Sequence, residues 1–253
     1  MKKTLFASLA SSSSGNCFVI KQGDTLGLID AGISYKRIAN ALSELGVTPE
    51  KLSFILITHE HKDHISGLKV LLKNSNPSIF VPESIEKYFK KEFFLSKIIP
   101  LKSREMNEFM GIKFIGFDVN HDSEACFGYR IGLSDKTIGF VTDIGKPSLT
   151  TIHFLKNSDY IVMESNYDKK MLMTGKYPHF LKQRIISPYG HLDNEVAVNL
   201  LKSVMHKGLK KVMLAHLSTS NNHPDIVYKR FSSEFKGNPE IVVASKDKTT
   251  MLF

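Results

Sequence analysis

Three histidines and two carboxylates lie within seven residues of this chain, directly behind an apolar run. The run is FILI at residues 54–57, and the segment that follows it is THEHKDH at residues 58–64. Imidazole and carboxylate groups are the usual ligands of zinc and manganese in proteins. A chain that gathers them where a buried strand ends therefore predicts a metal site. A single loop histidine is more often solvated, but that does not explain three in a segment of mixed composition.

The spacing within this segment favours two metal ions over one. If the segment leaves the strand extended, His59 and His61 point to the same side, because the side chains of a strand alternate. Asp63 and His64 then begin an amphipathic helix, which we predict over residues 65–73. The pattern differs from the helix of zinc peptidases, in which both histidines share one helical face with a glutamate between them.

The chain is long enough to bury a full hydrophobic core. It has 253 residues, of which 42% are hydrophobic, and no Gly/Pro-rich linker divides it, so we expect a single domain over residues 1–253. No segment approaches the roughly 18 consecutive apolar residues of a membrane span, and the start of the chain does not have the pattern of a signal peptide. Cys17 and Cys126 are too few for a disulfide framework. We therefore expect a cytoplasmic protein without membrane association, in which both cysteines are small buried residues.

The charge of the chain indicates what kind of partner it binds. The formal net charge is +9 at pH 7. A basic surface attracts polyanions and raises their rate of encounter, so the excess favours a nucleic-acid substrate. Each small lysine group taken alone is equally well explained as a solvated helix face.

Five residues of catalytic or ligand type stand just beyond the ends of apolar β-runs. They are His59, His121, Asp143, Glu164 and His216. Loops beyond strand ends form the cleft of a layered α/β protein, so these side chains predict one shared pocket. Strands come early in each half of the chain and helices late, which predicts two β-sheets packed face to face with helices outside. Residues 127–133 and 137–141 are expected to form a hairpin.

These residues resemble the metallo-β-lactamase superfamily over nearly the whole chain. The resemblance rests on THEHKDH at residues 58–64, on DAG at residues 30–32, and on the isolated His121, Asp143 and His216. It implies a four-layer αββα sandwich of two mixed sheets, with a two-metal site at the edge where the sheets meet. On that pattern one ion is held by His59, His61 and His121, the other by Asp63, His64 and His216, and Asp143 bridges them. An aspartate at the bridging position is typical of the hydrolases and nucleases of the superfamily.

Further motifs are similar to the YycJ subgroup, also called WalJ, whose members are 5′-to-3′ exonucleases acting on DNA. The motifs are SSSGN at residues 12–16, VNHD at 119–122, ESNYD at 164–168, GKYP at 175–178, GHL at 190–192 and LAHLS at 214–218. A more distant likeness is to the transfer-RNA 3′-processing endonucleases, in which a glutamate and a later histidine form a proton-donating pair. That likeness implies such a pair for Glu164 and His191. The alternative for His191 is a histidine that caps the helix starting near Asp193.

The expected chemistry is hydrolysis of a phosphodiester. Two divalent cations, Zn²⁺ or Mn²⁺ with Fe²⁺ as a further candidate, supply a hydroxide nucleophile and neutralise charge on the phosphate. We therefore expect Asp63 to serve catalysis as a ligand, and His191, oriented by Glu164, to act as general acid. For Asp30 two roles are open, orienting a ligand by a hydrogen bond or forming a turn.

Several alternatives stay open at the level of sequence. The loop of residues 11–16 either presents N–H groups to a phosphate or is a plain surface turn. The aromatic residues Tyr177, His179 and Phe180 either stack on exposed bases or belong to the core. The DNA exonuclease has three rivals: an RNA-processing endonuclease, a hydrolase of a small thioester or cyclic phosphodiester, and a non-catalytic nucleic-acid-binding protein.

Overall fold

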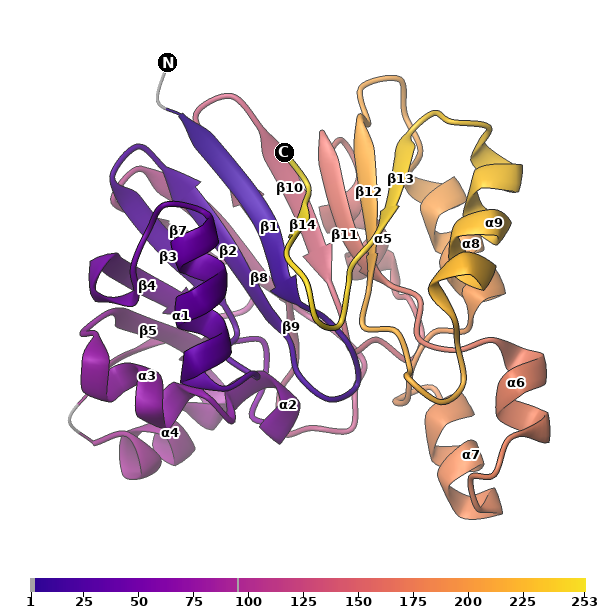
Figure 1. Cartoon of the computed structure of the whole chain (residues 1–253), viewed down its shortest axis with the longest axis horizontal. Helices are drawn as coiled ribbons and strands as arrows, with labels where there is room; N and C mark the ends of the chain where they lie inside the picture. Colours follow the sequence, from indigo (N-terminus) through magenta and orange to yellow (C-terminus); the bar gives the residue numbers. More distant parts are fainter. Residues whose placement is uncertain (1–2, 95) are drawn as a thin grey trace.

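The computed structural model describes residues 3–94 and 96–253, and two seven-stranded β-sheets pack face to face with helices on their outer faces (Figure 1). This is the αββα arrangement expected from the sequence, so the predicted fold class is confirmed. The sequence predicts no signal peptide at the start of the chain. The first two residues of that segment, Met1 and Lys2, lie outside the described residues. Within the two described ranges, every helix is too short or too polar to cross a membrane.

The first sheet comes from the N-terminal part of the chain and is completed by the last strand. In spatial order it contains β14 (Thr250–Met251), β1 (Thr4–Ala10), β2 (Cys17–Gln22), β3 (Thr25–Ile29), β4 (Leu52–Leu56), β5 (Ser78–Pro82) and β6 (Lys97–Leu101). The pairs from β14 to β3 are antiparallel, and those from β3 to β6 are parallel. Parallel neighbours need crossover connections, which bring helices onto the outer face of this sheet.

The second sheet repeats this mixed pattern in the C-terminal part. In spatial order it contains β13 (Glu240–Val243), β12 (Lys211–Ala215), β11 (Tyr160–Glu164), β10 (Thr137–Val141), β9 (Phe127–Gly132), β8 (Ile112–Asp118) and β7 (Met106–Phe109). The strands β7 to β10 pair antiparallel, and β10 to β13 pair parallel. The predicted hairpin of β9 and β10 is therefore confirmed.

Aromatic side chains fill the space between the two sheets. Phe18 from the first sheet and Phe140 from the second meet edge to face, with ring centroids 4.9 Å apart. Such a pair contributes about 0.5–1.5 kcal/mol beyond the burial of its area. Gly27 in β3 leaves room for the ring of Phe54, because a Cβ atom at Gly27 would lie 2.2 Å from that ring.

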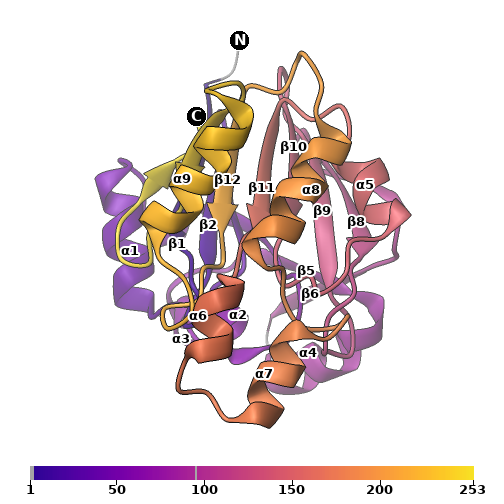
Figure 2. The same cartoon turned by 90° about the vertical axis from the view of Figure 1, so that its right-hand side faces the viewer.

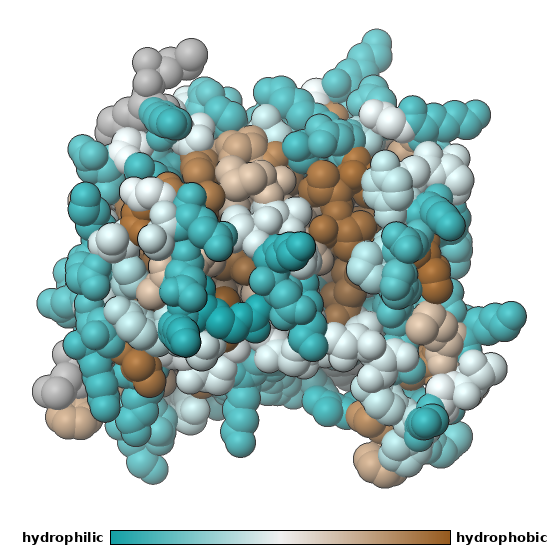
Figure 3. Space-filling view, viewed as in Figure 1, coloured by the Kyte–Doolittle hydropathy of each residue, from teal (hydrophilic) through white to brown (hydrophobic). Residues whose placement is uncertain are grey.

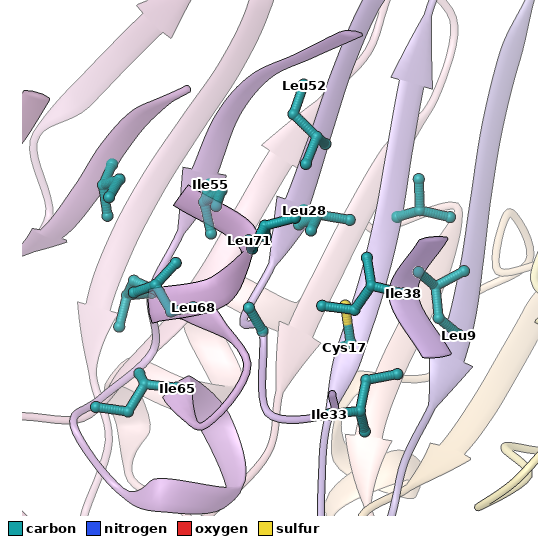
Figure 4. Close-up of a cluster of buried hydrophobic side chains, with 14 of the residues drawn as sticks. Leu9, Cys17, Leu28, Ile33, Ile38, Leu52, Ile55, Ile65, Leu68 and Leu71 are labelled. Atoms are coloured by element: carbon teal, nitrogen blue, oxygen red, sulfur yellow. The ribbon is translucent and has the colours of Figure 1, made fainter. Parts of the chain in front are cut away.

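Helices cover the outer face of each sheet. The first sheet is covered by α1 (Tyr35–Glu44), α3 (Leu68–Asn74) and α4 (Glu86–Glu92), and the second by α5 (Leu149–Leu155), α8 (Asn194–Val204) and α9 (Pro224–Phe235). Figure 4 shows Ile38 of α1 and Leu68 and Leu71 of α3 in one cluster with Leu28 and Ile55 of the first sheet. The remaining short elements are η1 (Pro49–Lys51), α2 (Lys62–Ile65), η2 (Glu83–Ile85), α6 (Lys169–Thr174) and α7 (His179–Ile186).

The helix predicted over residues 65–73 is divided between α2 and α3. The break lies at Gly67, where the chain passes against the loop that follows β3. The N–H of Gly67 donates to the carbonyl of Ala31 at 2.8 Å, and a Cβ atom at Gly67 would lie 1.9 Å from the carbonyl oxygen of Ile33. Contact between the two loops therefore overrides the helical pattern.

The loops after β3, β4, β10, β11 and β12 meet at one end of the two sheets, where α2, α6 and α7 also lie (Figures 1 and 2). Carboxyl ends of parallel strands form the usual binding crevice of α/β sheets. Most of the predicted site residues lie in these loops or at the strand ends beside them, whereas His121 lies between β8 and β9, and His191 lies between α7 and α8.

Candidate metal centre

The seven candidate ligands converge at this end of the sheets. They form two groups, and within each group the ligand atoms lie within 4.8 Å of one another: His59, His61 and His121 in the first, and Asp63, His64, Asp143 and His216 in the second. The structure therefore brings together every residue that the sequence suggested as a metal ligand.

The segment of residues 58–64 supplies ligands to both groups. After β4 the chain bends at Glu60 and is extended at His61, whose φ of −63° and ψ of 147° precede the first turn of α2. His59 and His61 lie on the same side, as predicted, with ring centroids 4.6 Å apart. The turn of α2 then carries Asp63 and His64 to the second group.

Asp143 lies between the two groups. Its Oδ1 atom is 3.7 Å from Nε2 of His121 and 3.5 Å from Nε2 of His216. Its Oδ2 atom is 3.2 Å from Nε2 of His64. Within the second group, Oδ2 of Asp63 lies 3.5 Å from Nε2 of both His64 and His216. Asp143 therefore occupies the position at which a ligand can contact two neighbouring ions.

Four histidines have their Nδ1 atoms turned to an acceptor outside the cluster. The acceptors lie at 2.7 to 3.3 Å and are Asp30 Oδ2 for His64, Glu164 Oε1 for His216, Thr58 Oγ1 for His59 and the Gly190 carbonyl for His121. When Nδ1 of a neutral imidazole donates a hydrogen bond, Nε2 carries a free lone pair. Metal-binding histidines are oriented in this way, so the four Nε2 atoms are prepared for a cation.

Two polar atoms of the cluster are buried without a hydrogen-bond partner among the described residues. They are Nε2 of His59 and Oδ2 of Asp143. An unpaired buried polar atom costs about 1–3 kcal/mol, and a charged one costs more. Divalent cations held by the two ligand groups would satisfy these atoms, and nitrogen with carboxylate oxygen is a donor set that suits Zn²⁺, Mn²⁺ and Fe²⁺. The residues present therefore fit divalent metal binding.

The electrostatics of the cluster also favour a cation. Burial raises the pKa of Asp63, but hydrogen bonds with His216 and His64 outweigh this and hold that pKa far below its ordinary value. Burial likewise raises the pKa of Asp143, and the neighbouring His216 and His64 lower it well below the ordinary value. In turn, burial lowers the pKa of His216, but Asp143, Asp63 and Glu164 raise it to about 10. Protons thus compensate the ionised carboxylates, and metal binding releases such protons.

Asp30 is buried and forms hydrogen bonds with residues of the cluster and of its surroundings. Its Oδ1 atom accepts a hydrogen bond from the N–H of Thr58, and its Oδ2 atom accepts one from the Thr58 hydroxyl, both at 2.8 Å. Nδ1 of His64 contacts the same Oδ2 atom at 2.7 Å. Of the two roles that the sequence left open, these contacts match the orientation of a ligand. Thr58 extends the contact to His59, a role that no sequence pattern indicates.

Three residues of the site have a left-handed backbone. The φ angle is 58° at Asp30, 55° at Asp143 and 55° at His216. This conformation costs a residue with a Cβ atom roughly 1–2 kcal/mol, so the surrounding contacts must impose it. The three residues follow β3, β10 and β12 closely, and the left-handed turn redirects the chain where each strand enters the cleft.

Glu164, the last residue of β11, contacts His191 as the sequence predicted. Its Oε1 atom lies 2.9 Å from Nδ1 of His191, while Oε2 accepts hydrogen bonds from the N–H groups of Ile144 and Leu192. Burial raises the pKa of Glu164, but His191 outweighs this and holds the pKa below its ordinary value. His191 is not a helix cap, because the side chain of Asp193 caps α8.

The loop of residues 11–16 supports the cluster. Ser11 Oγ accepts a hydrogen bond from the N–H of His216 at 2.8 Å and donates to Oδ1 of Asn16 at 2.9 Å. The N–H groups of residues 12 to 16 are all bonded to acceptors within the protein. The loop is therefore neither a plain surface turn nor a set of free phosphate donors, and both interpretations are wrong.

The cluster opens into a pocket of about 230 Å³, one wall of which is α7 with the residues before it. That wall consists of Tyr177, Leu181, Arg184 and Ile185. Arg184 is held by an ion pair with Asp122 at 2.5 Å. Phe180 is 73% exposed, and His179 is exposed as well, so neither belongs to the core. Tyr177 was singled out from the sequence, but the helix α7 was not predicted, because it has no buried residue and hence no apolar face toward a core.

Comparisons with known proteins identify the family of the chain. Residues 27–217 match the family described as the beta-lactamase superfamily domain. The chain is 35% identical to the exodeoxyribonuclease WalJ of Streptococcus pneumoniae over 228 residues. This alignment covers 88% of this chain and 85% of that protein. It is 32% identical to the exodeoxyribonuclease YycJ of Bacillus anthracis over 227 residues, and this alignment covers 87% of this chain and 85% of that protein.

A solved structure shows the same fold. The metallo-β-lactamase fold protein YhfI from Bacillus subtilis superposes with a TM-score of 0.77 over 98% of this chain and 100% of that chain, at 16% identity. At this identity the likeness concerns the fold alone. The family match and the two curated relatives together show that the chain belongs to the metallo-β-lactamase superfamily, in the group of its WalJ and YycJ relatives.

Proposed function

We propose that this protein is a metal-dependent phosphodiesterase that degrades DNA from the 5′ end. The observation that carries the proposal is the position of Asp143 between two ligand groups, beside the Glu164–His191 pair. That arrangement suits a phosphodiester, whose phosphate charge and leaving alkoxide both need to be neutralised. The relatives named as exodeoxyribonucleases support DNA as the substrate. The 5′-to-3′ direction rests on the resemblance to their group.

Two ions fit the two ligand groups. The first ion would be held by His59, His61 and His121, the second by Asp63, His64 and His216, with Asp143 between them. When bound, such ions lower the pKa of water towards neutrality and neutralise charge on the phosphate oxygens. Zn²⁺ and Mn²⁺ are the proposed metals, and Fe²⁺ suits the same donor set.

His191 is the proposed general acid. It lines the pocket, its side chain is 19% exposed, and Nδ1 contacts Glu164. Donation from Nδ1 to the carboxylate orients the ring, and Nε2 remains as the atom that delivers a proton to the leaving oxygen. A positioned acid of this kind contributes about 10²–10⁴-fold to the rate.

The rest of the pocket supplies contacts that a DNA strand needs. The guanidinium of Arg184 offers charged donors to a phosphate, and the ring of Tyr177 offers a surface for stacking. The exposed Phe180 extends this surface outside the pocket. The net charge of +9 supports a polyanion over a small thioester or cyclic phosphodiester. The complete set of candidate ligands with an adjoining acid pair argues against a protein that only binds nucleic acid.

Digestion of end-labelled substrates tests the proposal. Duplex DNA and RNA with 5′-phosphate or 5′-hydroxyl ends are incubated with the protein in Mn²⁺ or Zn²⁺, alongside Asp63→Ala. We expect mononucleotide release from the 5′ end of DNA by the natural sequence and none by Asp63→Ala. Full activity of Asp63→Ala would contradict the metal assignment, and preferential internal cleavage of RNA would establish the rival endonuclease.

We further propose that residues 1–253 form one domain that acts in the cytoplasm. The pairing of β14 with β1, which joins both ends of the chain in one sheet, supports a single domain. Cys17 and Cys126 are both buried and free, which supports a reducing compartment.

A further inference from the structure

A second, larger cavity adjoins the pocket of the metal centre. Its volume is about 460 Å³, against about 230 Å³ for the pocket itself. Ser218 lines both cavities, and Ser12 of the larger one directly precedes Ser13 of the smaller one. The second cavity therefore adjoins the place where the phosphate is proposed to bind.

The position of this cavity is that of a ligand site. Its walls include Leu217 and Ser218 after β12, and Val243 and Ala244 at the end of β13. These two strands are parallel neighbours, and ligands of α/β sheets bind outside the carboxyl ends of such strands. Figure 3 shows a hydrophobic strip in the region of β13 on an otherwise mostly hydrophilic face.

Apolar side chains form part of the walls. Leu217, Val243, Ala244 and Pro224 are apolar. The side chain of Asn222 is taken up by the fold, because its Nδ2 donates to the backbone carbonyls of residues 165 and 166 and its Oδ1 accepts from the N–H of residue 223. The apolar part of the walls suits the face of a flat, weakly polar group, and every nucleobase offers such a face.

The rim next to these walls is polar and positive. Lys246 is exposed there, and the loop that carries it is fixed by a hydrogen bond from Arg37 Nη2 to the Lys246 carbonyl at 2.6 Å. Ser218 Oγ accepts a hydrogen bond from the N–H of Asn221 and, among the described residues, donates to none. Ser218 lies at the boundary of the two cavities. An anionic backbone at the rim and a flat group inside match these features together.

We propose that this cavity is a nucleobase subsite. It holds the base of a nucleotide that adjoins the phosphate at the metal centre, and it does so without regard to the identity of the base. The volume supports this occupant, since pockets for organic ligands of this kind range from about 300 to 1,000 Å³. Phosphate and base of one nucleotide are joined through the sugar, so two cavities that share one side chain accommodate them together. The subsite rests on the proposed function, because its occupant is part of the DNA substrate.

A pair of variants tests the subsite. Thr219 is exposed and lines the cavity, so Thr219→Trp fills it without disturbing the core. Ser220→Trp is the matched control, because Ser220 is the next residue, is equally exposed and does not line the cavity. We expect Thr219→Trp to raise KM for single-stranded DNA by about tenfold, as for the loss of one stacked base, and Ser220→Trp to leave it unchanged. Both variants should hydrolyse methyl p-nitrophenyl phosphate, which has no base, at the natural rate.

An abasic nucleotide moved along the substrate provides an independent measurement on the natural protein. We expect one position beside the scissile phosphate at which the missing base raises KM by about tenfold. At this position Thr219→Trp should show no further loss, because the two changes remove the same contact. Oligo-dA and oligo-dT should give equal KM values.

Two results distinguish the subsite from the function on which it rests. DNA hydrolysis that is insensitive both to Thr219→Trp and to every abasic position would overturn the subsite and leave the nuclease intact. Hydrolysis of methyl p-nitrophenyl phosphate without any hydrolysis of DNA would overturn the proposed function, and the subsite with it.

Discussion

Oε1 of Glu164 lies 2.7 Å from Nδ1 of His216, a candidate metal ligand, and the same oxygen lies 2.9 Å from Nδ1 of His191. One carboxylate oxygen therefore orients a ligand and the proposed general acid together. A substitution of Glu164 should therefore affect both metal binding and proton delivery. A substitution of His191 should affect proton delivery alone.

Replacing His191 should remove proton delivery alone. We expect His191→Gln to lower kcat on DNA by about 10²–10⁴-fold, with metal content unchanged by elemental analysis. The loss should be much smaller on methyl p-nitrophenyl phosphate, because p-nitrophenolate leaves without a proton. His153→Gln is the control, since His153 is exposed on α5 outside the pocket. Equal losses on both substrates would exclude His191 as the acid.

Replacing Glu164 should weaken metal binding as well. Loss of a carboxylate behind a ligating histidine typically lowers metal affinity or activity by about 10–100-fold. We expect Glu164→Gln to show such a drop in affinity by competition with a chelating dye, together with a drop in kcat. If Glu164→Gln bound metal as tightly as His191→Gln, the contact with His216 would have no role in orienting that ligand.

Gly32 should be essential for the shape of the cluster. A Cβ atom at Gly32 would lie 1.7 Å from the carbonyl oxygen of Asp63, a backbone atom that cannot move without displacing α2. We expect Gly32→Ala to lower the free energy of unfolding by about 1–3 kcal/mol in urea titration, and to lower metal affinity. Gly132→Ala is the control, because its Cβ would meet Lys113 at an ordinary 3.6 Å. Equal stability of the two variants would contradict this close approach.

Stability should fall at alkaline pH because of the buried thiol of Cys17. Burial raises the pKa of this thiol well above its ordinary value, whereas in the unfolded chain the pKa is about 8.5. Below that pH both states keep the proton. Above it the unfolded state loses the proton and the folded state retains it, so the free energy of unfolding decreases as pH rises.

The measurement is a series of urea titrations between pH 7.5 and 10. We expect a decrease of up to about 1.4 kcal/mol per pH unit from this thiol above its unfolded pKa, and a shallower decrease for Cys17→Ala. The slope is the readout, since the substitution also lowers stability at every pH by removing buried volume. Identical slopes would show that Cys17 ionises equally in both states.

Side-chain chemistry at strand ends made the candidate ligands predictable. His59, Asp143 and His216 each follow a run of apolar residues, and the fold brings those ends together. Thr58 was not predictable in the same way, because a hydroxyl beside a histidine is common and its role depends on Asp30, which is 28 residues away in the chain. The left-handed backbone at the site residues likewise has no signature in the sequence.

Elements without a core-facing stripe were also missed. The helix α7 lines a pocket instead of a core, so its apolar residues do not repeat with a helical period. The strand β6 lies at a sheet edge, contains Pro100 and is mostly half-buried or exposed, so it does not read as a buried run. Residues 65–73 show the opposite case. Their helical pattern is clear, but the helix is interrupted at Gly67 by contact with the loop that follows β3.

A metal titration of nuclease activity shows whether two metal ions, with Asp143 between them, are needed for DNA hydrolysis. The metal-free protein is given stepwise equivalents of Mn²⁺ or Zn²⁺, and release of nucleotides from the 5′ end of labelled DNA is followed at each step, with Asp143→Ala in parallel. We expect no release without metal, full activity at two bound equivalents, and no activity of Asp143→Ala at any equivalent. Full activity of the metal-free protein, or of Asp143→Ala, would contradict this expectation.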